Sequence, residues 1–521
     1  MQTYKKCYYE KIVLVKRNYS MRTKKAVLNM VFGLIYQVIA IICGLITPRL
    51  ILATFGSTYN GVISSATQFL NMINILTLGI TGTTRVALYK TLADGDSLGT
   101  SRIMKATKRY MQKIGCCVIL YAIGLCVIYP YVSRNSLSHI ENAALIAIVS
   151  IGTFAQYFFG ISNMTLLNAD QSSYVNNIID IFKVVLNTVC VAVLIKAGAS
   201  VFIVKLGSSI VFLISPIVLN WYVKRKYNLV SNCEPDNAAL NNRGAVALHQ
   251  VANIVHDNTD IMVLTFFMDA KQISVYTVYY LVIGKIKTLL QVFTSGMEAA
   301  FGNMWVKHEI DTLNKVFKAY EHLLFSFTVV VFSCVGTLIL PFVSEYTRGI
   351  TDVVYYRVDF AVLITIAEAA FCIRQPYLLL VYATGNYEAT KRGALEEAII
   401  NLSLSIILVQ FVGINGVIIG TLVANVFRTV QYSIFVSNKI LNRSTVLIVK
   451  HVVWMLACMG VIVPIVMCLD EFVLASGWIG WLIKAVITFI AALTITVIFS
   501  MLFYRDDSMY LINKAKRVLH H

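Results

Sequence analysis

A stripe of polar side chains interrupts one hydrophobic stretch near the middle of the chain. His249, Asn253, His256 and Asp260 are spaced four, three and four residues apart, which places them on one helix face, and Asp257 widens that face. A charge that faces lipid is costly, so the stripe is expected to face a wet cavity, where it would bind a sugar or a proton. A structural polar seam with a neighbouring helix is the alternative. Asp257 and Asp260 are the candidates for H⁺ or Na⁺ coupling, and the histidines could titrate near neutral pH.

Basic side chains also fall inside hydrophobic stretches. Arg85, Lys285 and Arg374 are the predicted contacts for a phosphate group, because Arg and Lys bind phosphate oxygens. An internal salt bridge is an equally good interpretation of each. The spacing of Asp180 and Lys183 predicts an ion pair one helical turn apart. The further charges predicted to lie within the membrane are Glu298, Glu368 and Glu397.

Three sequence features concern the helices that carry these charges. Pro376, close to Arg374, predicts a break that either bends the helix during transport or is a static kink. Arg428 is expected near the cytoplasmic end of its span, where a long side chain can reach the interface. The small-residue spacing of Gly413, Gly416 and Gly420 could serve packing within the bundle or association of two copies.

Membrane-spanning helices must position these residues. The chain has 521 residues, of which 58% are hydrophobic and only 13% are charged, whereas globular proteins contain about 25% charged residues. The apolar blocks are roughly 20 residues long, which is the length a helix needs to cross a bilayer. The sequence therefore predicts an all-α polytopic protein of about 14 spans, near 27–47, 61–88, 112–132, 142–166, 174–196, 200–223, 244–268, 273–300, 320–343, 358–382, 394–411, 414–437, 447–469 and 479–503.

The net charge of +18 indicates orientation, not nucleic-acid binding, because the basic residues lie in short loops between apolar blocks. With the N-terminal tail in the cytoplasm, the cytoplasmic segments hold most of these residues. The predicted outside segments hold only Arg49, Arg134, Lys196, Lys271, Arg348 and Arg357. This bias supports an even number of spans and two cytoplasmic termini, with no cleaved signal peptide.

An internal repeat divides the chain. Asn187 and Asn401 lie in similar apolar surroundings 214 positions apart, and each stretch follows a turn of small residues. Duplicated halves are common in transporters, and their binding site lies at the repeat interface. The predicted organisation is a basic tail, a six-helix lobe, a basic linker, a second six-helix lobe, two extra helices and a cytoplasmic tail, at 1–26, 27–224, 225–243, 244–438, 447–503 and 504–521.

Three segments resemble a known family. They are TPRLILATFGSTYNGVISSATQFLNMINILTLGI, NIVHDNTDIMVLTFFMDAKQISVYTVYYLV and ATGNYEATKRGALEEAIINLSLSIILVQFVGINGVIIGTLVAN. Together they are similar to the polysaccharide flippases of the multidrug/oligosaccharidyl-lipid/polysaccharide (MOP) exporter superfamily, over about residues 25–440. The glycine usual in the second loop of that family is replaced here by Met268 or Ser274. The resemblance implies two six-helix bundles, a V-shaped cavity between them and alternating access.

The resemblance implies a flippase for undecaprenyl-diphosphate-linked oligosaccharide in the bacterial cytoplasmic membrane, serving O-antigen, capsule or exopolysaccharide assembly. Its expected partners are the lipid-linked glycan, membrane lipids and polysaccharide polymerase machinery. A cation-coupled multidrug exporter and a lipid II flippase are the alternatives; the absence of Lys and Arg from 27–47 disfavours the latter. A membrane-embedded glycosyltransferase or polymerase would need larger outside loops than 48–60 or 344–357. We therefore expect no enzyme activity, no metal and no cofactor other than the H⁺ or Na⁺ of coupling. No nucleotide-binding GxxxxGK[ST] loop occurs.

Overall fold

The computed structural model describes residues 2–77, 79–230, 232–237, 258–471 and 475–519. Within these ranges the regular elements are helices, and no strand occurs. Among the described residues, eleven helices are long and apolar enough to cross a membrane, which confirms the all-α polytopic class. The predicted second, seventh and tenth spans do not appear among the eleven as separate helices. The predicted second span, 61–88, is divided between the end of α1 (Gln2–Asn71), a 3₁₀ turn at Met72–Thr77 and α2 (Ile80–Ala93). The seventh lies largely outside the described ranges, and the tenth is broken.

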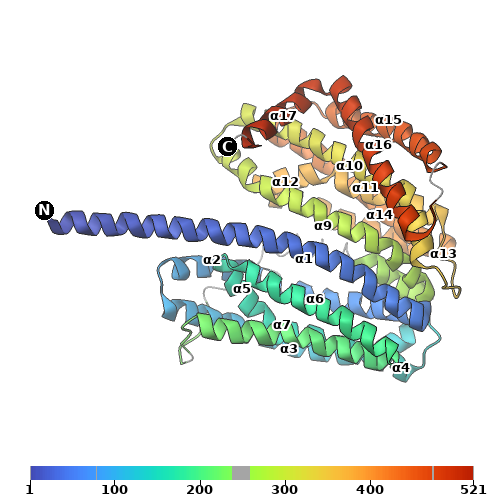
Figure 1. Cartoon of the computed structure of the whole chain (residues 1–521), viewed down its shortest axis with the longest axis horizontal. Coiled ribbons are helices and arrows are strands. Elements are labelled where there is room, and N and C mark those ends of the chain that lie inside the picture. Colours follow the sequence, from blue (N-terminus) through green and yellow to red (C-terminus); the bar gives the residue numbers. More distant parts are fainter. Residues whose placement is uncertain (1, 78, 231, 238–257, 472–474, 520–521) are drawn as a thin grey trace. The chain divides into compact units, whose positions relative to one another are not determined.

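The chain divides into two compact units, residues 1–254 and 255–521. Unit 1 runs from blue to green in Figure 1. It comprises α1 (Gln2–Asn71), α2 (Ile80–Ala93), α3 (Ser97–Val132), α4 (His139–Ala155), α5 (Ile161–Ala169), α6 (Ser173–Lys196) and α7 (Val201–Lys226).

Two parts of unit 1 differ from simple rods. The predicted outside loop 48–60 is helical within α1, which bends at Gly56 (φ 84°). A left-handed φ suits glycine because it has no Cβ, so the bend is placed where the chain must turn. Residues Gln156–Gly160 form a π-helical turn between α4 and α5.

Unit 2 contains helical residues 258–267 and nine labelled α-helices, which run from light green to red in Figure 1. These are α9 (Ala270–Val306), α10 (Ile310–Tyr346), α11 (Val358–Ile373), α12 (Gln375–Ala383), α13 (Tyr387–Val412), α14 (Ile414–Phe435), α15 (Val446–Asp470), α16 (Gly477–Phe503) and α17 (Arg505–Leu519). The predicted C-terminal tail is thus largely helical, as α17.

The predicted break near Pro376 is confirmed. Helix α11 ends at Ile373, and α12 begins at Gln375 with a proline in its first turn. Proline has no N–H to donate, so it is tolerated in the first turn of a helix and not in its interior. Arg374 is the residue between the two helices, which explains why the predicted span 358–382 is not one continuous rod.

The same turn recurs in the two units at the spacing of the sequence repeat. After α5, Gln171 has a φ of 56°, and after α12, Gly385 has a φ of 73°. Three backbone hydrogen bonds close each turn at corresponding positions: Asp170 to Leu166, Gln171 to Asn168 and Ser172 to Leu167 in unit 1, and Thr384 to Leu380, Gly385 to Tyr382 and Asn386 to Val381 in unit 2. The same left-handed turn also ends α6, at Gly198, and α9, at His308, so it is a common helix end and the duplication stays a prediction.

The helices that follow these turns also correspond. Asn187 on α6 accepts a hydrogen bond from Ser208 on α7 at 2.6 Å. Asn401 on α13 donates one to Thr421 on α14 at 3.0 Å. In each unit an asparagine therefore joins a helical hairpin, which is the feature that the two sequence stretches share.

Glycines let α13 and α14 approach closely. A Cβ at Gly416 would lie 2.3 Å from the carbonyl carbon of Leu408, and a Cβ at Gly420 would lie 2.5 Å from Oγ of Ser405. Both neighbours lie on α13, so these residues pack within the bundle. The structure thus assigns the small-residue spacing to the intramolecular alternative.

We expect Gly416→Ala to lower the free energy of unfolding by about 1–3 kcal/mol, because the new methyl group meets backbone and the helices must separate. Reversible unfolding of the purified protein in mixed detergent measures the change. Gly460→Ala on α15 is the matched control, since a Cβ there meets no atom within 4 Å. Equal stability of the two variants would contradict the proposed close packing.

A cluster of charged and polar side chains around Asp170 connects α1, the turn after α5 and the end of α7 in unit 1. Asp170, in the turn after α5, accepts hydrogen bonds from Lys25 Nζ at 3.0 Å and Tyr227 Oη at 2.6 Å. Lys226 Nζ lies 3.6 Å from the same carboxylate. Burial alone would raise the pKa of Asp170, but the hydrogen bonds from Tyr227, Lys25 and Ser172 and the charge of Lys25 hold it below its ordinary value.

Asp170→Asn is expected to lower stability at neutral pH by about 1–2 kcal/mol, a modest figure because the carboxylate is partly exposed. A depressed pKa stabilises the fold above the unfolded pKa, and this stabilisation is lost as pH falls through the folded value. The difference in the free energy of unfolding between wild type and Asp170→Asn should therefore become smaller below about pH 4. Unfolding midpoints measured from pH 7 to pH 3 test this, with the exposed Asp94→Asn as control. A difference that stayed constant with pH would contradict it.

Candidate functional site

The structure places part of the predicted polar stripe. His249, Asn253, His256 and Asp257 lie outside the described residues, so their predicted roles stay predictions. Asp260 is described and is only 6% exposed, on the helical segment 258–267 of unit 2.

Side chains from two other helices surround the Asp260 carboxylate. Tyr276 on α9 donates its hydroxyl to Oδ2 at 2.9 Å. Thr421 on α14 lies 2.9 Å from Oδ1 and 3.0 Å from Oδ2, and its hydroxyl oxygen accepts from Asn401 on α13. Side chains of α9 and α14 thus contact a buried carboxylate of the segment 258–267, and α13 is linked to it through Thr421.

Aromatic side chains connect Asp260 with a second carboxylate. The Tyr276 ring stacks on Tyr280 with centroids 5.7 Å apart. Lys287 Nζ lies 3.4 Å from the Tyr280 hydroxyl and 2.9 Å from Oε2 of Glu368 on α11. The predicted intramembrane charge Glu368 is therefore compensated by a lysine of α9.

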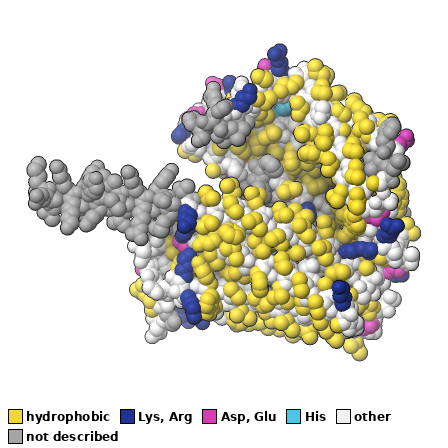
Figure 2. Space-filling model, in the orientation of Figure 1, with side chains coloured by type: hydrophobic (Ala, Val, Ile, Leu, Met, Phe, Trp, Pro, Cys, Tyr) yellow, Lys and Arg dark blue, Asp and Glu magenta, His cyan; other side chains and the backbone are white. Residues whose placement is uncertain are grey.

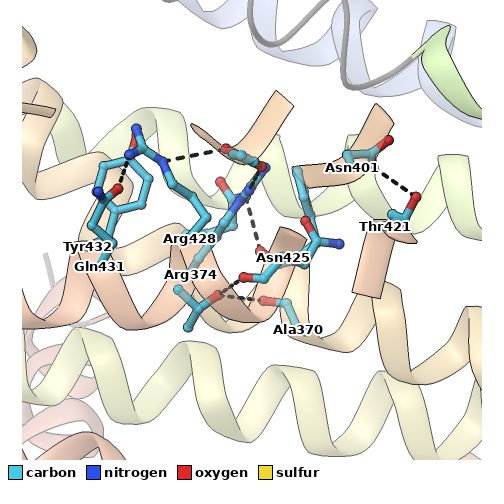
Figure 3. Close-up of polar contacts among 12 residues, drawn as sticks. Ala370, Arg374, Asn401, Thr421, Asn425, Arg428, Gln431 and Tyr432 are labelled. Carbon is cyan, nitrogen blue, oxygen red and sulfur yellow. Dashed lines mark hydrogen bonds and ion pairs between the residues drawn. The ribbon is translucent and has the colours of Figure 1, made fainter. Parts of the chain in front are cut away.

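A third carboxylate, Glu397 on α13, lies between Arg374 and Arg428, the two arginines labelled in Figure 3. Arg374, at the break between α11 and α12, forms an ion pair with Oε1 of Glu397. Nε of Arg428 on α14 lies 3.4 Å from Oε2. The guanidinium carbon of Arg374 also lies 4.4 Å from the centroid of the Phe371 ring, a cation–π contact. Of the two accounts weighed for Arg374, the structure shows the internal salt bridge.

The expectation for Arg428 is wrong. Its side chain is 1% exposed and does not extend to an interface. It donates to the Thr390 carbonyl at 3.1 Å and to the Tyr432 hydroxyl at 2.5 Å, and it contacts Gln431 (Figure 3). Snorkelling was inferred from distance to the end of the span, but the acceptors offered by α13 and α14 satisfy the guanidinium inside the unit.

These contacts define the unit 2 network, a set of three carboxylates and three cations on five helical segments: Asp260, Glu368, Glu397, Lys287, Arg374 and Arg428. All six side chains are buried. Isolated charges would be strongly destabilising here, whereas matched numbers of opposite charges compensate one another. Protonation or cation binding at one carboxylate would disturb this balance, so the network can couple ion occupancy to helix packing.

The two other predicted phosphate contacts lie in less buried positions. Lys285, on α9, is partly exposed, and no ion pair to it occurs among the described residues. Two residues further along, Lys287 faces Glu368 instead. Arg85, on α2 of unit 1, is exposed and likewise has no ion pair in the described ranges. Glu298 is exposed on α9.

Unit 1 holds the predicted Asp180–Lys183 pair, which is confirmed at 2.5 Å. Ser215 on α7 also donates to Asp180, at 3.3 Å. The pair lines a cavity of about 570 Å³ together with Asn187 and Lys205. Two lysines and one aspartate give this cavity a basic character.

Neither a family model nor a curated protein matches the sequence. Solved structures do match the fold. An inward-facing multidrug resistance MATE transporter of the MOP superfamily has a TM-score of 0.61 at 13% identity, covering 75% of this chain and 92% of its own. The lipid II flippase MurJ in an inward closed conformation has a TM-score of 0.65 at 13% identity, covering 92% of this chain and 99% of its own. The chain has the fold of MOP superfamily transporters.

A third match shows that pocket charge varies on this fold. A MOP superfamily transporter from Pyrococcus furiosus, described by the reverse polarity of its binding pocket, has a TM-score of 0.54 at 14% identity, covering 78% of this chain and 96% of its own. That description suggests a different function for the Pyrococcus furiosus protein, so the shared fold does not by itself fix the function of this chain.

Sequence reasoning missed several members of the unit 2 network. Thr421 and Tyr276 are uncharged, so the energetic cost of burying a charge in the membrane does not point to them. Their contacts depend on where α9 and α14 lie relative to Asp260. Lys287 carried the same signal as Lys285, namely a cation within a span. The two are two residues apart and point to different sides of α9, so only the position of α11 decides which one meets Glu368.

Proposed function

We propose that this protein is a flippase that moves an undecaprenyl-diphosphate-linked oligosaccharide across the bacterial cytoplasmic membrane by alternating access. The observation that carries the proposal is the length of the fold likeness. The match to the lipid II flippase covers 92% of the chain, whereas the match to the MATE transporter covers 75%. The chain also has two long apolar helices, α15 and α16, beyond α14, as expected for a carrier of lipid-linked cargo.

The available cations agree with an anionic cargo. Of the three proposed phosphate contacts, Lys285 and Arg85 have no ion pair within the described residues, and a diphosphate offers oxygens that lysine and arginine bind well. Arg374 could bind phosphate only if it exchanged Glu397 for the cargo. We therefore rank Lys285 first among the three proposed phosphate contacts.

The unit 2 network supplies the proposed coupling. The Asp260 carboxylate is hydrogen-bonded to Tyr276 on α9 and Thr421 on α14. Binding of a proton or of Na⁺ to this carboxylate would therefore change its contacts with both helices. A ligand shifts a conformational equilibrium only if it binds the two states differently. Contacts from several helices to one carboxylate provide such a difference.

Two alternatives lie in the same superfamily. A lipid II flippase is favoured by the match to MurJ and disfavoured by the lack of Lys and Arg in 27–47. A multidrug exporter is favoured by the MATE match and disfavoured by the basic side chains within the spans. Both share the proposed transport mechanism and differ in cargo.

Complementation distinguishes these cargos. The gene is introduced separately into strains lacking a polysaccharide flippase, a lipid II flippase or a drug exporter, and surface polysaccharide, viability and drug resistance are scored. We expect the gene to rescue surface polysaccharide only. Lys285→Ala should abolish this rescue. Lys307→Ala, which changes an exposed residue at the end of the same helix, should rescue as wild type does. Unchanged accumulation of lipid-linked units on deleting the gene in its native host would overturn the proposal.

A further inference from the structure

Unit 1 contains a second cavity that the proposed transport path does not use. It measures about 670 Å³, within the roughly 300–1,000 Å³ of small-molecule sites. Residues of α3, of the π-helical turn, of α5, of α7 and of the segment after α7 line it, and these elements contact one another within the unit. We call it the basic pocket.

The basic pocket has cationic side chains and no acidic one among its lining residues. Lys105, Lys108 and Gln112 follow one another on one face of α3, with Arg109 beside them, and Lys224 comes from the last turn of α7. Lys108, Arg109 and Lys224 are exposed. Two helices therefore direct positive charge toward the same hollow.

The interior of the basic pocket is apolar with an amide floor. Phe158 and Phe159 come from the π-helical turn, and Phe159 is 43% exposed. Asn163 donates to Asn220 at 3.4 Å at the base. Gly115 on α3 makes room for Phe158, since a Cβ there would lie 3.0 Å from that ring. A π-helical turn is rare and frequently marks a functional site.

The segment after α7 forms the remaining wall and is fixed to α3. The Val230 N–H donates to Ser101 Oγ at 2.9 Å, and the Asp236 N–H donates to the Arg102 carbonyl at 3.2 Å. Lys105 Nζ donates to the Cys233 carbonyl at 2.7 Å. Specific hydrogen bonds therefore hold this wall in place. An excess of positive charge that only orients the chain in the membrane would not need such contacts.

Cations together with the aromatic side chains of Phe158 and Phe159 fit an amphiphile with a phosphate group. Figure 2 shows hydrophobic side chains over much of the visible face of unit 1, with Lys and Arg mainly toward its ends. A pocket with three exposed cations at the end of such a unit lies where headgroups meet the acyl chains. Basic pockets between membrane helices bind anionic headgroups, and the cytoplasmic leaflet is rich in them.

We propose that the basic pocket binds the phosphate headgroup of an anionic phospholipid of the surrounding leaflet. The exposed Lys108, Arg109 and Lys224 contact the phosphate oxygens, and Phe158 and Phe159 contact the start of the acyl chains. This site lies within unit 1 and is separate from the unit 2 network. It therefore does not depend on the identity of the transported cargo.

Matched double variants test the proposal on the full-length protein in neutral detergent. Lys108→Ala with Lys224→Ala removes two charges that line the pocket. Lys113→Ala with Arg225→Ala removes two exposed charges from the same helices outside it. Both pairs change the net charge equally, and binding of short-chain phosphatidylglycerol is titrated against each.

The pocket pair is expected to weaken phosphatidylglycerol binding roughly 30-fold and the control pair less than about threefold. Wild type should bind phosphatidylcholine of equal chain length far more weakly. Equal weakening in the two pairs, or equal binding of the two lipids, would overturn the proposal. Displacement of the lipid by inorganic phosphate at the same concentration would also overturn it, because the site would then recognise a free anion. Unchanged melting temperatures confirm that both variants are folded.

Discussion

Replacing Glu397 with Gln is expected to lower the free energy of unfolding by about 3–5 kcal/mol, because two buried arginines lose their shared counter-charge. Arg374 is 4% exposed and Arg428 is 1% exposed, so water cannot solvate the uncompensated guanidinium groups. Gln keeps the size and part of the hydrogen bonding of Glu, so the effect reports the lost charge. Reversible unfolding of the purified protein in mixed detergent measures it.

The neighbouring carboxylate provides the control. Glu396 is exposed, and it accepts a hydrogen bond from Nε2 of Gln431 at 3.3 Å. Glu396→Gln should change stability by less than about 1 kcal/mol. If Glu397→Gln were as mild as this control, the two arginines would not depend on Glu397 for compensation, and the unit 2 network would need another account.

Asp260→Asn should reduce transport by at least about fivefold while leaving the protein folded, if ion binding at Asp260 contributes about 1–3 kcal/mol of coupling. Asn keeps the shape of the side chain and can accept from Tyr276 and Thr421, but it cannot take up a proton or neutralise a cation. Proteoliposome transport of a lipid-linked oligosaccharide, driven by an imposed H⁺ or Na⁺ gradient, measures the effect. The gradient that wild type requires also identifies the coupling ion.

Two variants separate coupling from a structural defect. Asp311→Asn, in the exposed first turn of α10, should transport as wild type does. Thr421→Ser keeps the hydroxyl that contacts Asp260 and should retain most transport, whereas Thr421→Val should not. Gradient-driven transport by Asp260→Asn at the wild-type rate would exclude Asp260 as the coupling group.

Charge compensation explains why so many ionisable groups can lie within the helices of unit 2. Each carboxylate of the network has a cation or several hydroxyl donors as its partner. These partners come from a helical segment other than that of the carboxylate. In the proposed transport cycle, movement of one helix would separate a pair, and binding of cargo or a coupling ion would offset the electrostatic cost. A network of this kind can make the conformational change depend on occupancy.

The fold class, the Asp180–Lys183 ion pair and the broken helix at Pro376 could be predicted from the sequence. Apolar blocks of roughly 20 residues suffice for the all-α polytopic class, because a bilayer leaves a helix few alternatives. Asp180 and Lys183 lie one turn apart on one helix, so their pairing follows from helical periodicity alone. The break beside Pro376 follows from the missing proline N–H.

Only the tertiary structure decided which charges meet. Periodicity places Lys285 and Lys287 on α9 but cannot show that α11 brings Glu368 to Lys287. Distance along the chain suggested an interfacial Arg428, whereas the packing of α13 on α14 surrounds it with Glu397, Thr390 and Tyr432. The physical reason is that a partner's position depends on helix packing, which is set by many small contacts between segments far apart in sequence. A single sequence reports which residues need partners, and the packed helices determine which partners they find.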